Sequence, residues 1–109
     1  MIVVTIYRDG DRHYAGFECL GHSGYADHGE DIVCAGASAL VLNTINSIEQ
    51  LTETRLHTEA DEESGHIEVE FINEPDAGTL LLVSSMILGL QQITENYGDE
   101  FISLQFKEV

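Results

Sequence analysis

Residues 21–42 read GHSGYADHGEDIVCAGASALVL and change character halfway along. The polar first part contains the glycines Gly21, Gly24 and Gly29. Glycine tolerates most backbone conformations, so this part predicts a flexible loop. Asp31 is a favourable residue type for a helix N-cap, and from residue 32 onward apolar residues recur at helical spacing. The stretch therefore predicts a mobile polar loop that leads into a helix over residues 32–51.

The rest of the chain alternates short strand patterns with one more helix. An Asp-Gly pair at residues 9–10 predicts a hairpin turn, and Pro75 and Gly98 are typical of the two ends of a helix. Strands are predicted at residues 2–7, 13–20, 56–60, 66–72 and 101–106, and the second helix at residues 79–97. The predicted order is β-β-α-β-β-α-β. We expect one α+β domain over residues 1–109, with two helices packed on a mixed or antiparallel sheet.

The second predicted helix carries more than one apolar stripe. One stripe is expected to pack on the sheet. The surplus indicates either close packing against the first helix or a subunit partner.

Composition limits the possible partners and locations. The formal net charge is −16 and the chain has only four Lys and Arg residues, which argues against direct contact with nucleic acid or an anionic membrane. It favours a basic partner, although a solvated surface or adaptation to salt would give the same balance. No apolar run approaches the ~20 residues of a membrane span, and no signal peptide is evident. We expect a cytoplasmic protein with free thiols.

Cys34 and His22 are the candidate catalytic pair. With Asp31 as N-cap, Cys34 would fall in the first turn of the helix, where free N–H groups and the dipole stabilise a thiolate. His22 could return across the loop as general base, and the helix start could hold an oxyanion. Asp31 could orient His22, and Ser38 could hydrogen-bond near the site.

Two other interpretations use the same residues. A lone cysteine in an apolar stretch is often an inert core residue. A zinc site could draw on a cluster of five side chains, His13, Cys19, His22, His28 and Cys34. These five lack the paired spacing usual for zinc, so we predict no metal and no cofactor.

The residues from Gly21 to Leu40 closely resemble the hallmark of the ribosomal-processing cysteine protease family, Prp. That hallmark is a G-H-x-G-[YF]-A loop followed by G-x-D-I-[VI]-C-A-x-x-S, and no position departs from it here. The resemblance implies a Cys/His dyad of Cys34 and His22. It places Asp31 and Ser38 at supporting positions and gives Gly21 and Gly24 a role in loop mobility.

The resemblance also implies a substrate and an assembly. Family members are homodimers that remove a short N-terminal extension from a protein of the large ribosomal subunit, after paired aromatic residues. A basic ribosomal substrate suits the acidity of this chain. Two alternatives stay open: a non-catalytic ribosome-assembly binding module of the same fold, and a different thiol enzyme such as an acyl or thioester transferase.

Overall fold

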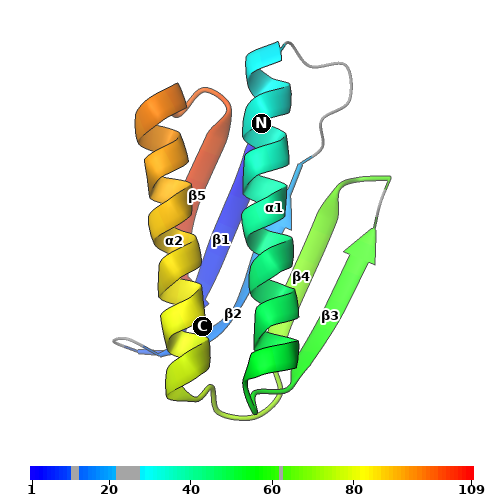
Figure 1. The fold of residues 1–109 in the computed structure, drawn as a ribbon, viewed down its shortest axis with the longest axis vertical. Coiled ribbons are helices and arrows are strands. Elements are labelled where there is room, and N and C mark those ends of the chain that lie inside the picture. The colour runs from blue at the N-terminus through cyan, green and yellow to red at the C-terminus, as the bar shows by residue number, and fades with distance from the viewer. Residues whose placement is uncertain (11–12, 22–27, 62) are drawn as a thin grey trace.

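The chain folds as one mixed sheet with two helices on one face (Figure 1). The computed structural model describes residues 1–10, 13–21, 28–61 and 63–109, with the backbone alone described at residues 28–31. The elements are β1 Ile2–Arg8, β2 Tyr14–Leu20, α1 His28–Leu51, β3 Leu56–Asp61, β4 His66–Phe71, α2 Ala77–Tyr97 and β5 Ile102–Glu108. The predicted order β-β-α-β-β-α-β and the α+β class are confirmed.

The strand order is β3-β4-β2-β1-β5. β5 runs parallel to β1, while the pairs β1–β2, β2–β4 and β3–β4 are antiparallel. β1 therefore lies inside the sheet and β3 and β5 form its edges. In Figure 1, α2 lies near β1 and β5 and α1 lies over β2, so the β3–β4 hairpin extends beyond the helix layer.

The core lies between the helices and the sheet. Its side chains are apolar and buried, and they come from every strand except β3 and from both helices: Ile2, Val4, Ile6, Phe17, Cys19, Val69 and Ile102 from the sheet, and Val33, Cys34, Ala37, Val41, Ile45, Ile48, Val83, Met86, Ile87 and Leu90 from the helices. Strand residues alternate between faces. The intervening residues of β2 and β4 therefore lie on the sheet face that no helix covers.

The surplus apolar stripe of α2 stays exposed. Leu81 and Leu88 are 71% and 57% exposed, although α2 packs beside α1. Packing between the two helices therefore does not use this stripe. The stripe remains available for a partner.

By length and composition alone, residues 32–51 and α2 are apolar enough to cross a membrane. The expectation that no stretch approaches this length was therefore wrong. The evidence for a span is weak, because the core helices of soluble proteins pass the same test.

α1 begins at His28, four residues before the predicted start. Gly29 and Asp31 lie inside the helix, so the prediction that Asp31 is the N-cap was wrong. Glycine costs a helix interior about 1 kcal/mol, which made a loop the simpler prediction. Acidic residue types such as Glu30 and Asp31 favour a first helical turn, and here the helix extends through the glycine.

Candidate active site

Cys34 lines a cleft between α1, the end of β2 and the β3–β4 hairpin. The thiol is free, and the residue is only 8% exposed. Ser38, one turn farther along α1, lines the same cleft, which has a volume of about 380 Å³. The structure thus brings together Cys34 and Ser38, two of the predicted site residues.

The wall opposite Cys34 is apolar, and the rim is polar. Ala60 and Ile67 form this wall from the paired strands β3 and β4, whereas Leu42 lines the cleft from α1, the helix that carries Cys34. Asp61, Gly65 and His66 line the cleft at the turn of the hairpin. Because the hairpin extends beyond the helix layer, this apolar wall is available to an apolar side chain of a ligand.

Cys19 lines the same cleft but is a poor nucleophile. Burial, together with smaller contributions from the nearby Cys34 and Glu18, raises the pKa of the Cys19 thiol to about 11. Only the thiolate is nucleophilic, so Cys19 stays protonated and inert at neutral pH. Of the two cysteines, Cys34 is the candidate nucleophile.

The earlier start of α1 changes the surroundings predicted for Cys34. Cys34 is the seventh residue of a helix that begins at His28, so it lies in the second turn. The free N–H groups of a helix belong to its first four residues, here residues 28–31. The prediction that Cys34 lies in the first turn was therefore wrong, and the dipole acts on it more weakly because the effect falls off within one turn.

The predicted loop lies partly outside the described residues. This applies to His22 and Gly24, so the geometry of the Cys34–His22 pair stays a prediction, as does loop mobility. Gly21 is described at the end of β2, with φ of +137°. A Cβ there would lie 2.6 Å from the carbonyl oxygen of Met1, so close approach of the chain to β1 requires glycine at this position.

The five residues considered for zinc do not converge. His13 directly precedes β2 and Cys19 lies near its other end. At about 3.3 Å per residue, six residues of extended chain separate them by roughly 20 Å. One ion cannot bind both.

A different titratable cluster lies on the open face of the sheet, where Glu18, His66 and Glu68 meet. From the sequence, His66 would be interpreted as a surface residue beside a hairpin turn. Alternation in β4 did place His66 and Glu68 on one polar face, but the pairing of β4 with β2 was not predicted, and that pairing brings Glu18 beside them.

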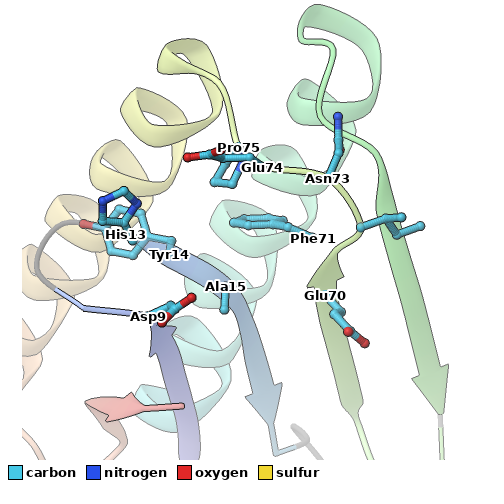
Figure 2. Close-up of a pocket in the computed structure, with 10 residues that line it drawn as sticks. Asp9, His13, Tyr14, Ala15, Glu70, Phe71, Asn73, Glu74 and Pro75 are labelled. Carbon is cyan, nitrogen blue, oxygen red and sulfur yellow. The ribbon is translucent and has the colours of Figure 1, made fainter.

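A larger cavity, of about 480 Å³, lies at the opposite end of β2 (Figure 2). Figure 2 shows Tyr14, Phe71 and Pro75 around it, with the carboxylates of Asp9 and Glu74 nearby. No cysteine lines it. Size does not identify the candidate site here, because the smaller cleft holds the candidate nucleophile, Cys34.

Comparison with known proteins agrees with a thiol-dependent site. The family model described as cysteine protease Prp matches residues 1–102. The ribosomal processing cysteine protease Prp of Bacillus subtilis is 35% identical over 103 residues, covering 91% of this chain and 92% of that protein. The Staphylococcus aureus protein of the same name is 36% identical over 87 residues, covering 80% of this chain and 81% of its own length.

Solved structures agree with the fold along the whole chain. The crystal structure of the S. aureus protease in complex with a substrate peptide has a TM-score of 0.90 at 32% identity, and covers 98% of this chain and 100% of that one. The same protease with a covalently linked product peptide has a TM-score of 0.86 at 33% identity, with the same coverage.

An α+β fold with a free thiol in a cleft, matched along its length by proteases, defines a cysteine protease. The chain belongs to the Prp family of cysteine proteases.

Proposed function

We propose that this protein is an endopeptidase that removes the N-terminal extension of a large-subunit ribosomal protein, cleaving after aromatic residues. The observation that carries the proposal is Cys34, a free thiol in a cleft with an apolar wall. Relatives at 35–36% identity are named ribosomal processing cysteine proteases. The S. aureus relative has been solved with a substrate peptide and with a covalently linked product peptide.

The proposed reaction uses Cys34 as nucleophile and His22 as general base, then acid. The Cys34 thiolate attacks the scissile carbonyl carbon and forms a C–S bond. The C–N bond breaks as His22 donates a proton to the leaving amine. Water, deprotonated by His22, then attacks the thioester and releases the new carboxylate and the thiol. Free N–H groups of residues 28–31 are the proposed donors to the oxyanion.

The cleft suits the proposed preference for aromatic residues. Leu42, Ala60 and Ile67 line the cleft from α1 and from the hairpin, and burial of an aromatic ring against such side chains is favourable. The Gly-rich loop around His22 would close on the peptide, with Asp31 and Ser38 supporting the dyad. Such closure excludes water and completes many active sites.

The proposed partners follow from charge and from the exposed stripe. A net charge of −16 favours a basic substrate, and ribosomal proteins that contact RNA phosphates need Lys and Arg. Leu81 and Leu88 support a homodimer, because exposed apolar patches often mark subunit interfaces. The proposed site of action is the cytoplasm.

Peptide cleavage tests the proposal. The substrate is a peptide that spans the aromatic residues of the extension, and its control is the same peptide with those residues replaced by alanine. We expect the wild type to cleave only the first peptide, and Cys34→Ala and His22→Ala to cleave neither. No cleavage by any of the three, with slow alkylation of Cys34 at neutral pH, would favour a non-catalytic binding module.

Rapid alkylation of Cys34 without peptide cleavage has a different meaning. It would favour another thiol enzyme, such as an acyl or thioester transferase. Processing that persists in Cys34→Ala would also contradict the proposed role of this residue.

A further inference from the structure

Three ligand-type side chains meet on the sheet face that no helix covers. Glu18 lies in β2 and is directly paired with Glu68 of β4, and His66 lies two residues before Glu68. The Nε2 atom of His66 is 2.8 Å from Oε2 of Glu18 and 3.9 Å from Oε2 of Glu68. One ligand atom from each residue lies within 4.8 Å of the other two.

These separations suit a single small divalent cation. Zinc binds imidazole nitrogen and carboxylate oxygen at roughly 2.0–2.2 Å, and many zinc sites use three protein ligands and one water. Tetrahedral ligands at that bond length are about 3.4 Å apart. The distances of 2.8 and 3.9 Å lie on either side of this value, so small side-chain rotations would complete the set.

The surroundings favour a cation in two further ways. Glu18 and Glu68 are directly opposite each other, and Glu59 of β3 is opposite Glu68 on its other side. Like charges in direct cross-strand pairs are destabilising, and a bound cation would offset that repulsion. The hydroxyl of Tyr7 hydrogen-bonds Glu18, as outer-shell groups do when they orient a metal ligand.

The positions are also rigid and accessible. β2 and β4 are paired strands inside the sheet, so their backbones hold the ligands at a constant spacing. The side chains of Glu18, His66 and Glu68 are 24%, 29% and 47% exposed, which leaves room for an ion to enter and keep a water ligand.

We propose that Glu18, His66 and Glu68 form a binding site for one zinc-class divalent cation. His66 also lines the Cys34 cleft, so the ion would lie on the open face of the sheet next to the rim of that cleft. The site does not depend on the proposed peptide substrate. Zinc binding can therefore be tested separately from proteolysis.

Isothermal titration of Zn²⁺ into the full chain, carrying Cys34→Ala to remove the thiolate, tests the site. We expect one ion per chain, and His66→Gln and Glu68→Gln should each weaken its affinity by at least about 10-fold, since loss of even an outer-shell partner costs about that much. Tyr7→Phe should weaken it by a smaller factor, because it removes the partner of a ligand and not the ligand.

His57→Gln is the matched control. His57 is also an imidazole on the sheet, 3.2 Å from Glu59, but it is not part of the three-residue cluster. We expect its affinity to stay within about 2-fold of the parent chain, since a change outside the ligand set leaves the first and outer shells intact. Affinity unchanged by His66→Gln would overturn the proposal. So would the absence of binding, or binding abolished by His22→Ala but not by His66→Gln.

Discussion

The end of the molecule where α1 ends and α2 begins is dense with hydrogen bonds, whereas the end that holds Cys34 is an open cleft. At the first end, Thr79 Oγ1 lies 2.7 Å from Thr54 Oγ1 and 3.0 Å from Thr52 Oγ1. Asp76 caps α2 by accepting from the N–H of Thr79 at 2.9 Å, and it also accepts from the N–H of Glu53. We call these four residues, Thr52, Thr54, Asp76 and Thr79, the threonine–aspartate network.

At the Cys34 end the side chains line a cleft and do not cap a helix. Cys34 and Ser38 face Ala60 and Ile67 across the cleft. Buried polar networks make a region rigid when every member is paired, whereas a binding cleft must leave surface uncovered. The difference indicates that stability and chemistry are located at opposite ends of the same helices.

The largest expected difference in activity is between the two variants in which one cysteine is replaced by alanine. Cys34→Ala should lower kcat/KM for peptide cleavage by at least about 10³-fold, because the nucleophile is lost. Cys19→Ala should keep most of the activity. It should lower the free energy of unfolding by about 1–2 kcal/mol, because the side chain is buried in the core and leaves a small cavity.

Urea denaturation and peptide cleavage, measured on both cysteine variants, separate the two roles. Equal activity in Cys34→Ala and wild type would contradict the assignment. A large loss of activity in a stably folded Cys19→Ala would do so as well.

Thr79→Val tests the opposite end. The substitution keeps the shape of the side chain but removes a fully buried hydroxyl, which leaves Thr52 and Thr54 with one hydrogen-bond partner fewer. The free energy of unfolding should fall by about 1–3 kcal/mol, while kcat/KM at a temperature well below unfolding should stay within about 2-fold. A selective loss of activity without loss of stability would contradict the inference that stability and chemistry are located at opposite ends of the molecule.

Asp76→Ala should lower Tm at pH 7 by several degrees, because it removes the N-cap of α2. The N–H groups of Thr79 and Glu53 lower the pKa of Asp76 below its ordinary value of 3.8. A carboxylate with a lowered pKa stabilises the fold above pH 3.8, and this contribution is lost as the pH falls through the lowered value.

The difference in Tm between wild type and Asp76→Ala should therefore shrink below pH 3.8. Asp76→Asn is the control, since Asn also caps helices but carries no charge. A difference between wild type and Asp76→Ala that does not change with pH would show that the carboxylate contributes no charge-dependent stability.

The smallest expected effect concerns His66. A hydrogen bond to Glu18 raises the pKa of His66 above its ordinary value of 6.5, and the charges of Glu18, Glu68 and Asp61 raise it further, against a lowering by desolvation. Stability from a raised pKa is fully present below pH 6.5 and is lost as the pH rises through the raised value.

In buffer with chelator, His66→Gln should therefore cost about 0.5 kcal/mol or less at pH 5.5, since the pair is partly exposed and screened. It should cost still less at pH 8.5. Thermal unfolding of both chains at the two pH values measures the difference. An equal cost at the two pH values would show that the stability from the Glu18–His66 hydrogen bond does not depend on protonation, and a larger cost at the higher pH would contradict the raised pKa.

Most of the secondary structure was accessible from local patterns. Alternation in residues 66–72 and helical spacing after residue 32 identified a strand and a helix, and Gly98 was correctly placed at the end of α2, where its N–H bonds the carbonyl of Thr94. The start of α1 was missed because Gly29 favoured a loop, whereas the acidic residues after it favour a first helical turn and the helix extends through the glycine.

The candidate site was accessible only in part. Cys34 and Ser38 were identified because their spacing on one helix is local. The sequence did not identify Cys19 as a second thiol in the cleft, because no local pattern predicts which strand end lies beneath which helix. The same holds for Ile67 and His66, which reach the cleft through the β3–β4 hairpin.

The sequence by itself determined the order of the elements and the acidic character of the chain, and it singled out Cys34 as the candidate thiol, with His22 and Ser38 as its predicted partners. These depend on periodicity, composition and short spacings, which act along the chain. Only the tertiary structure decided the strand order β3-β4-β2-β1-β5 and, with it, the apolar wall opposite Cys34 and the Glu18–His66–Glu68 cluster. Pairing between distant strands produces the apolar wall and the three-residue cluster. The register of that pairing depends on the packing of the whole sheet and not on any one segment.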